Sequence, residues 1–399
     1  MIKFKSFLIK ILTLISNLNF DPFFFKKKKI LVYDTETSQY YKNFFDKKKI
    51  FFHSNRIYSP ISNVNFFVLT WSIINFFFYK NLHLSQIYSI FVIAKVKPKI
   101  IITFTDYDFF ILNLKKFYPK IKIIIFQHQQ RSNKILKKKN FKNKFIVDHV
   151  CVFGKNLKSY YSQFLNTSFK ITGSIKNNFY KSNKKFNRKK KELLLISSFR
   201  PHINYFKEKV SNFQIQSLKN IYLFCQINKI KLSILPWAPI EENHKKYYVK
   251  EQEYYKKIFQ GDNYKMLKKN HFIDSYNISS KFDYFVSHNS TLGYELLSRN
   301  YRVAIIRKEI NYTSKNKNNL PVIDSLTSYR PKGYIWTDSC EKRETFRVLN
   351  NIIGISKTRN KHFINKYVNP IMMHDFQCEN NFKFLKSIGF KVKKNVYSK

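Results

Sequence analysis

The sequence predicts an α/β fold of two doubly wound domains that face each other across a cleft, with C-terminal helices packing back onto them. Three observations lead to this prediction. Short runs of β-branched and aromatic residues alternate with longer helical patterns along most of the 399 residues. Near the middle, residues 181–191 form a basic linker with a single apolar residue, which cannot contribute to a core. The alternation then resumes, and 399 residues suffice for two independent cores.

The first domain is expected to cover residues 28–180. Its apolar runs have the length and the β-branched content of buried strands. We expect strands at 30–33, 50–52, 99–104, 121–126, 149–153 and 169–172. Helical patterns fill the gaps at 65–79, 84–95, 107–117 and 155–165. Strands that alternate with helices in this way are typical of parallel sheets covered by helices.

The second domain is expected to cover residues 192–356 and to repeat that organisation. We expect its strands at 192–197, 231–235, 282–286 and 301–306. Its helices are expected at 209–228, 244–259, 291–299 and 341–353. The last residues, 357–399, have a helical pattern and are expected to pack back across the domains.

The first 27 residues form a basic segment with the spacing of an amphipathic helix. Phe7, Leu8, Ile11 and Ile15 fall on or near one side of it. Lys10 interrupts the apolar run and no small-residue cleavage site follows, so a signal peptide is not indicated, and the run is too short to span a bilayer. A helix on an anionic membrane surface therefore stands beside two alternatives, a helix packed on the domain and a frayed end.

A second apolar run, FFVLTWSIINFFF, extends from residue 66 to residue 78. It is also too short for a membrane-spanning helix. We therefore predict a helix buried in the core of the first domain.

The formal net charge of +50 raises the question of nucleic-acid binding. However, only 11 of the 74 basic residues are arginine, and the abundant Lys, Asn, Ile, Phe and Tyr are the amino acids of A/T-rich codons. The charge is spread over all segments and no recognised binding module accompanies it, so no specific nucleic-acid partner is expected. Some of the lysines could instead serve an anionic membrane surface or an anionic substrate.

The four cysteines lie far apart and form no CxxC pair: Cys151, Cys225, Cys340 and Cys378. Neither a zinc site nor a disulfide framework is indicated. A reducing cytoplasm fits this usage, with association at the inner face of the cytoplasmic membrane left open.

The segment VSHNSTLGYELL, residues 286–297, follows an expected strand and leads into an expected helix. The N-terminus of such a helix offers unpaired N–H groups and a partial positive charge to an anion, and Ser290 and Thr291 add hydroxyl groups. Gly293 is unfavourable inside a helix and could allow close approach of a ligand or of backbone. Glu295 could accept hydrogen bonds from ribose hydroxyls. The alternative is an ordinary helix cap, with Glu295 favouring the helix dipole.

Further polar residues follow other expected strands. Ser198 and Arg200 end the first strand of the second domain, where Arg200 could bind a diphosphate or form a surface ion pair. Gly173, Ser174 and Asn178 close the first domain, where they could approach a ligand or shape a hinge.

In the first domain, Asp34 and His128 each follow an expected strand, and either could act as a general base. His128 is a candidate general base because its ordinary pKa lies near neutrality, although a structural histidine bonded to a loop carbonyl is the alternative. Asp106 and Asp108 could act as a base or bind a metal, but the apolar run after them favours a helix cap. Spacing alone identifies no metal site.

Several segments, taken in order, resemble a family of bacterial surface-carbohydrate biosynthesis proteins, the O-antigen or capsule enzymes. These segments are VYDTETS, KPKIIITFTDYDFFILNLKKFYPKIKIIIFQHQQRSN, DHVCVFGKNLKSYYSQF, ITGSIKNN, LLLISSFR and SHNSTLGYELLSRN. The resemblance covers roughly residues 28–390. It implies a glycosyltransferase-B-like fold of two Rossmann-like domains, with a nucleotide-sugar site near Ser290, Thr291, Glu295 and Arg200 and an acceptor in the first domain.

Two departures from the family pattern bear on the site. Gln127-His128-Gln129 stands where a Gln-Asn-Gly-like turn is expected, which leaves the identity of the catalytic base open because a glycine would admit an acceptor more closely. Tyr334-Ile335-Trp336 stands in place of a Pro-Phe-Trp-like element and conserves its bulk.

The leading hypothesis is a metal-independent glycosyltransferase or glycosyl-phosphate transferase of surface-polysaccharide synthesis. Its partners would be a nucleotide-sugar donor and a carbohydrate or lipid-linked acceptor, and no further cofactor is expected. Three alternatives remain: a UDP-sugar 2-epimerase, a basic nucleic-acid-binding or membrane-binding protein without catalytic activity, and a degenerate family member that scaffolds assembly at the membrane.

Overall fold

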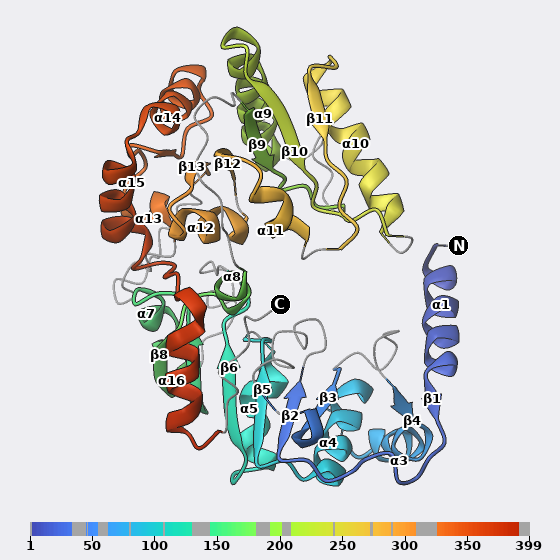
Figure 1. Cartoon of the computed structure of the whole chain (residues 1–399). Coiled ribbons are helices and arrows are strands. Elements are labelled where there is room, and N and C mark those ends of the chain that lie inside the picture. Colours follow the sequence, from blue (N-terminus) through green and yellow to red (C-terminus); the bar gives the residue numbers. More distant parts are fainter. Residues whose placement is uncertain are drawn as a thin grey trace.

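The architecture comes from a computed structural model of the whole chain (Figure 1). The description covers residues 2–33, 45, 47–54, 63–79, 81–106, 108–129, 144–180, 192–201, 209–241, 244–271, 274–288, 290–308 and 325–390. Two parallel six-stranded sheets form two α/β domains, as predicted from the alternating pattern. The basic linker 181–191 and Asp34 lie outside the described residues.

The first sheet has the strand order β3-β2-β5-β6-β7-β8. Its strands are β2 (Ile30–Tyr33), β3 (Ile50–His53), β5 (Ile100–Thr103), β6 (Lys122–Phe126), β7 (Phe145–Val152) and β8 (Leu165–Ile171). The associated helices are α4 (Leu84–Val96), α5 (Phe109–Phe117), α7 (Leu157–Ser162) and α8 (Ile175–Phe179), with a short 3-10 turn, η1, at Lys47–Lys49.

Both faces of the first sheet are buried, because side chains alternate between the faces along each strand. Ile123 and Ile125 of β6 belong to a large core that also contains residues of α4 and α5. Ile124 and Phe126 face the other way, into a smaller cluster that includes Phe384 from near the C-terminus. This explains why the strands read as continuous apolar runs.

The second sheet has the strand order β11-β10-β9-β12-β13-β14. Its strands are β9 (Glu192–Ile196), β10 (Lys231–Leu235), β11 (Tyr264–Met266), β12 (Tyr284–Ser287), β13 (Arg302–Ile306) and β14 (Trp336–Thr337). The associated helices are α9 (Lys209–Ile227), α10 (Lys245–Phe259), α11 (Asp274–Ser279), α12 (Thr291–Ser298), α13 (Leu326–Tyr329) and α14 (Lys342–Gly354).

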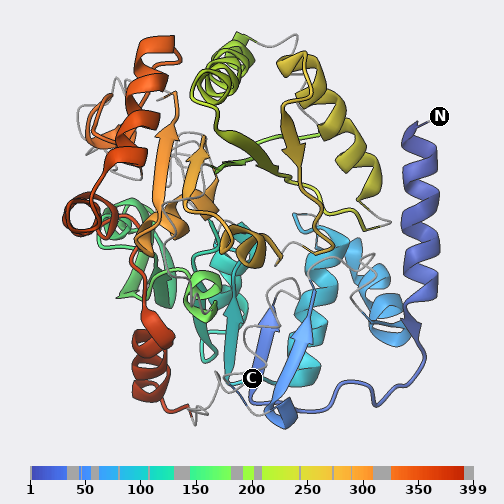
Figure 2. The ribbon, with the colours of Figure 1, turned by 45° about the horizontal axis from the view of Figure 1, so that its top comes forward.

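The C-terminal part of the chain crosses from the second domain back to the first (Figures 1 and 2). It comprises α15 (Lys357–Phe363), the π-helical turn η2 (Ile364–Val368), the 3-10 turn η3 (Phe376–Cys378) and α16 (Glu379–Ser387). The Asn156 N–H donates to the Pro370 carbonyl at 2.9 Å, and the Asn381 side chain donates to the Thr172 carbonyl at 3.2 Å. The return of this segment over the first sheet confirms that part of the predicted fold.

At the other end, α1 (Ile2–Ser16) is followed by β1 (Leu18–Asn19), which pairs in parallel with β4 (Val64–Asn65) at the start of α3 (Phe66–Phe76). The prediction that residues 66–78 form a buried core helix is wrong. α3 buries Val68, Leu69 and Ser72, whereas Trp71 is 55% exposed. The apolar composition was sufficient to predict the helix, but not whether another element covers it.

Candidate functional site

The second sheet has one point at which the direction of strand addition reverses. The chain passes from β9 outward to β10 and β11, and then returns to the other side of β9 for β12, β13 and β14. β9 and β12 are direct neighbours, with Ile196 opposite Ser287 at their carboxyl ends. In open α/β sheets, ligands bind beyond the carboxyl ends of the strands at such a switch point. The loop after β9 carries Ser198 and Arg200, and the segment after β12 carries Ser290 and Thr291, the N-cap and first residue of α12. The fold therefore brings four of the predicted nucleotide-site residues to neighbouring strand ends.

Ser290 is the N-cap residue of α12, with an extended backbone and no capping hydrogen bond from its side chain. It therefore occupies the position of a cap without acting as a side-chain cap. Ser290 and Thr291 are both half-buried. The hydroxyl of Ser290 and the positive end of the helix dipole thus lie at the strand ends, where an anion would be stabilised.

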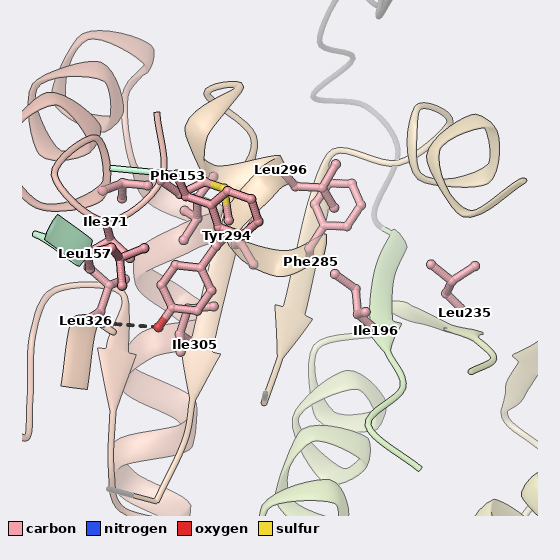
Figure 3. Close-up of a cluster of buried hydrophobic side chains, with 14 of the residues drawn as sticks. Phe153, Leu157, Ile196, Leu235, Phe285, Tyr294, Leu296, Ile305, Leu326 and Ile371 are labelled. Atoms are coloured by element: carbon pink, nitrogen blue, oxygen red, sulfur yellow. Dashed lines mark hydrogen bonds between the residues drawn. The ribbon is translucent and has the colours of Figure 1, made fainter. Parts of the chain in front are cut away.

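The structure supplies a packing reason for Gly293. A Cβ atom at this position would lie 2.6 Å from Ser287 Oγ and 2.7 Å from Ser287 Cβ. α12 can therefore pack closely on the end of β12 only if residue 293 has no side chain. The neighbouring Tyr294 fixes the helix from its other side, because its buried hydroxyl accepts from the Leu326 N–H at 3.1 Å (Figure 3).

Glu295 is buried at the junction of the two domains. Its Oε1 accepts from Ser174 Oγ at 2.5 Å, and its Oε2 accepts from the Tyr276 hydroxyl at 2.7 Å. Ser174 also is the N-cap of α8, where its hydroxyl accepts from the Asn177 N–H at 3.4 Å. The predicted ribose-binding residue and a predicted hinge residue are therefore direct partners across the junction.

The rest of α8 is bound to α12 as well. The Asn177 side chain donates to the Ser298 hydroxyl at 3.0 Å, and the half-buried Arg299 guanidinium donates to Asn177 and to the Tyr180 carbonyl. Burial lowers the pKa of Arg299 from its usual value. Polar contacts therefore hold the carboxyl end of β8 against the helix that follows β12.

The remaining predicted hinge residues lie beside these contacts. Gly173 adopts a left-handed backbone with φ of 68°, and an added Cβ would lie 2.3 Å from the Met373 carbonyl. Asn178 is buried, donates to the Thr172 carbonyl at 2.8 Å and accepts from the Asp375 N–H at 2.9 Å. Gly173 thus forms the turn between β8 and α8, and Asn178 of α8 binds this turn to the returning C-terminal segment.

A carboxylate that the sequence analysis missed organises the other side of the switch point. Glu251 of α10 is fully buried and accepts from the Ser197 hydroxyl and from the N–H groups of Trp237 and Ala238. Burial raises its pKa, and these hydrogen bonds oppose that rise. One signal was present in the sequence: Glu251 falls on the apolar stripe of α10, between Tyr248 and Tyr255.

Glu251 thereby ties the loop after β9 to the loop after β10. Ser198 lies in the first loop and accepts from the Gln214 side chain at 2.8 Å. In the same loop, the Arg200 guanidinium lies over the Trp237 ring, 5.8 Å from its centroid, and donates to the Phe199 carbonyl at 2.8 Å. Stacking and this local hydrogen bond orient Arg200 at the strand ends.

His288 is a second residue that the sequence analysis did not single out. It directly follows β12 and is buried, with Nε2 at 2.7 Å from the hydroxyl of Ser217 in α9. Burial lowers its pKa to about 4, so the imidazole is neutral at physiological pH. His288 therefore fixes the start of the loop that carries Ser290.

The first sheet has its own switch point, between β2 and β5. The strands are tied there by the Thr103 hydroxyl, which donates to the Tyr33 carbonyl at 3.0 Å. Beyond β5, Asp106 is buried and accepts from the Tyr161 hydroxyl, whereas Asp108 caps α5 by accepting from the Phe110 N–H at 2.9 Å. The cap predicted for this Asp-x-Asp pair is thus formed by Asp108.

His128 follows β6 and is half-buried, with its ring at 6.3 Å from that of Phe104. The preceding Gln127 is buried, and its side-chain oxygen Oε1 accepts from the Phe153 N–H at 2.9 Å. Gln127 therefore joins the ends of β6 and β7, while His128 follows β6, the strand next to the switch point. Within the described ranges, no group of three or more His, Cys, Asp or Glu side chains could hold a metal ion.

The same arrangement of two domains occurs in solved structures. A UDP co-structure of MnaA from S. aureus is 15% identical and superposes with a TM-score of 0.51, covering 91% of this chain and 97% of that one. A UDP-GlcNAc 2-epimerase from Methanocaldococcus jannaschii, in complex with UDP-GlcNAc and UDP, is 11% identical with a TM-score of 0.51, covering 91% and 100%. At these identities the likeness establishes the fold, which is of the glycosyltransferase-B type.

Sequence comparison identifies the family. No curated protein matches the chain in sequence. In the part of the chain that the structure describes, no helix is long and apolar enough to cross a membrane. The profile of the family described as "putative O-antigen biosynthesis protein" matches residues 127–388, which include the end of the first domain and the whole of the second sheet. The chain belongs to this O-antigen biosynthesis family.

Proposed function

We propose that the chain is a glycosyltransferase that moves a sugar from a nucleotide-activated donor to a carbohydrate or lipid-linked acceptor. The observation that supports this proposal is the switch point between β9 and β12, because Arg200 follows the first of these neighbouring strands and Ser290, with the N-terminus of α12, follows the second. A helix N-terminus and a guanidinium at one strand edge suit a diphosphate. Membership in an O-antigen biosynthesis family supports a sugar as the transferred group.

In the proposed reaction, negative charge develops on the diphosphate as the bond to the sugar breaks. The dipole of α12, the Ser290 and Thr291 hydroxyls and Arg200 stabilise this charge without a metal ion. Glu295 would hold the ribose by exchanging Ser174 or Tyr276 for ribose hydroxyls. Glu251 acts indirectly, because it positions the loops that carry Arg200 and Trp237.

The acceptor hydroxyl must lose a proton as it attacks the sugar. His128 or Asp34 would accept that proton, since each follows a strand at or next to the switch point of the first sheet. His128 is half-buried and hence open in part to solvent, as a base that exchanges protons requires.

The donor site can be tested by titrating UDP, GDP and CMP into the wild-type chain, Ser290→Ala and Arg200→Ala by calorimetry. Loss of a hydrogen bond to a charged phosphate should weaken binding of the preferred nucleotide by about tenfold or more. Ser159→Ala, an exposed serine in the first domain, is the matched control and should bind as the wild type does. Unchanged affinity of both site variants for every nucleotide bound would rule out this donor site.

A UDP-sugar 2-epimerase is the second candidate, favoured by the fold shared with a UDP-GlcNAc 2-epimerase. Epimerisation at C2 needs side chains that remove and return a proton, and carboxylates are among the groups that can do so. Among the described residues at the strand ends, Asp106 accepts from Tyr161 and Glu295 from Ser174 and Tyr276, which disfavours such a role.

Incubation with UDP-GlcNAc in the absence of an acceptor separates these candidates. An epimerase interconverts the 2-epimers under that condition, whereas a transferase requires an acceptor for sugar transfer. A scaffolding member of the family would bind the nucleotide sugar but would not turn it over, either with an acceptor or without one.

A further inference from the structure

Most apolar side chains of α3 are not covered by other parts of the described structure. The helix packs against α4, with Val68 and Leu69 buried and the Trp71 ring 6.3 Å from that of Phe91 in α4. Trp71 nevertheless remains 55% exposed and Phe67 50%, and just beyond the end of α3 Phe78 is 78% exposed. Exposed aromatic side chains that cluster in this way mark an interaction site.

α1 has the same property. It lies at the periphery of the first domain in both views (Figures 1 and 2). Leu14 packs against the core, but Leu8, Leu12 and Ile15 are 42%, 62% and 57% exposed. A helix that exposes this many large aliphatic side chains gains little stability from burial within the chain itself.

The two helices are joined into one surface by the pairing of β1 with β4. Leu18 lies opposite Val64, and the Asn65 side chain donates to the Asp21 carbonyl at 2.7 Å. Next to this pair, the rings of Phe20 and Phe66 lie 5.1 Å apart. We call the exposed apolar side chains of α1 and α3, with Phe20, the α1–α3 surface.

The charge around the α1–α3 surface has one sign. Residues 1–33 contain seven lysines and one acid, Asp21, and residues 64–105 contain no acid at all. Lys10 is exposed on α1, and Lys26, Lys27 and Lys29 are exposed where the chain leaves β1 for the first sheet. Aromatic side chains flanked by lysines suit the boundary between acyl chains and anionic headgroups.

We propose that the α1–α3 surface docks the chain on an anionic phospholipid bilayer, with α1 and α3 lying in the interface. A second copy of the chain is a poorer occupant, because each copy carries a net charge of +50 and the lysines would be brought face to face. The bilayer offers both an apolar phase for Trp71 and negative charge for the lysines. This inference rests on exposure and charge and is independent of the proposed sugar transfer.

The test is sedimentation of the full chain with vesicles of phosphatidylglycerol and phosphatidylcholine in equal amounts, and with vesicles of phosphatidylcholine alone. The wild type should bind the first kind more tightly, and salt should weaken that binding. Trp71→Ser combined with Phe67→Ser should reduce partitioning by about tenfold or more. Ile227→Ser, which removes a side chain 58% exposed on the second domain, is the matched control and should bind as the wild type does.

Tryptophan fluorescence gives an independent readout. Trp336 is fully buried and Trp237 lies in the second domain, so quenching by brominated phosphatidylcholine, mixed into the anionic vesicles, should depend on Trp71 and be lost in Trp71→Phe. Equal sedimentation of the double variant and the wild type would overturn the inference, because vesicle binding would then depend on charge alone and not on the exposed apolar side chains. Self-association without vesicles that the double variant abolishes would overturn it as well. Thermal midpoints equal to that of the wild type would show that the exposed substitutions leave the fold intact.

Discussion

Ser174 of the first domain donates its hydroxyl hydrogen to Oε1 of Glu295 in the second domain, across an oxygen–oxygen distance of 2.5 Å. The two residues are 121 positions apart in the sequence and both are buried. The second carboxylate oxygen accepts from Tyr276. In the proposed donor site, a ribose would bind Glu295 only by replacing or joining a protein partner. Nucleotide binding would then be coupled to the contact between the domains.

This coupling predicts opposite behaviour of two variants. Glu295→Ala leaves the buried hydroxyls of Ser174 and Tyr276 without their acceptor and should lower the free energy of unfolding by about 1–3 kcal/mol. It should also weaken nucleotide binding. Ser174→Ala should cost about 1 kcal/mol of stability, yet it frees one carboxylate oxygen, so nucleotide affinity should be unchanged or higher. Denaturant unfolding and calorimetry measure the two quantities. Equal losses of affinity in both variants would contradict this role of Glu295.

The role of Glu251 in anchoring the loops after β9 and β10 can also be tested. Its carboxylate accepts hydrogen bonds from three donors. In Glu251→Gln the amide NH₂ group would face one of these N–H donors, and we expect about 2–4 kcal/mol of lost stability. Nucleotide affinity should fall as well, because the loops with Arg200 and Trp237 lose their common anchor. Glu253→Gln, an exposed change on the same helix, is the control and should alter neither quantity. Stability and affinity equal to those of the wild type in Glu251→Gln would exclude this anchoring role.

Gly293 and Gly354 form a matched pair of helical glycines. At Gly293 an added Cβ would meet Ser287 at 2.6 Å, whereas at Gly354 nothing lies within 4 Å. Gly293→Ala should destabilise the chain by about 1–3 kcal/mol, because α12 must move away from β12. Gly354→Ala should be neutral or stabilise by up to about 1 kcal/mol. Thermal and denaturant unfolding of the two variants test this, and equal effects would refute the packing explanation of Gly293.

Buried histidines make stability depend on pH. Burial lowers the pKa of His288 and of His374 from 6.5 to about 4, and that of His53 to about 3. In the unfolded chain these side chains take up protons near pH 6.5, whereas in the folded chain they stay neutral until the pH reaches the lowered values. Their contribution to stability is therefore complete above about pH 6.5 and is lost as the pH falls toward about 4.

His288→Gln should accordingly show a shallower loss of the thermal midpoint between about pH 7 and pH 4.5 than the wild type does. His362→Gln, a change at an exposed histidine, should keep the slope of the wild type. The slopes are compared rather than the midpoints themselves, because loss of the contact with Ser217 also lowers the midpoint at every pH. A slope in His288→Gln equal to that of the wild type would show that its titration does not contribute.

The strands were predictable where the apolar pattern was unbroken. The bounds of β2 match the prediction, because all four of its residues are apolar and buried. Those of β10 match as well, although Lys231 and Ser233 interrupt its apolar residues, because four of its five residues are buried. β7 begins at Phe145 rather than at residue 149, because the strand contains Asp148. That carboxylate accepts from the Ile123 N–H at 2.8 Å and pairs with Lys115 beside a register shift. β11 and β14 were missed because strands of three and two residues have too short a pattern.

The positions of the proposed donor-site residues at the strand ends were predictable from local pattern, and their contacts were not. Small polar residues after an apolar strand pointed to Ser198, Arg200, Ser290 and Thr291, which the strand order does bring to neighbouring strand ends. Glu251 and His288 were missed because their importance comes from partners on other elements. A buried carboxylate within a helix is recognised only when its hydrogen-bond donors are known.

By itself, the sequence determined the two α/β domains, their order and the family, because alternation of apolar runs is a local property that repeats along the chain. The tertiary structure alone decided which carboxylates are held by protein partners, why residue 293 must be glycine, and that α3 is exposed. These depend on which distant segment covers a given side chain. The segment that covers a side chain decides whether it is buried and which hydrogen bonds it makes. The residue type alone indicates only what kind of partner the side chain requires.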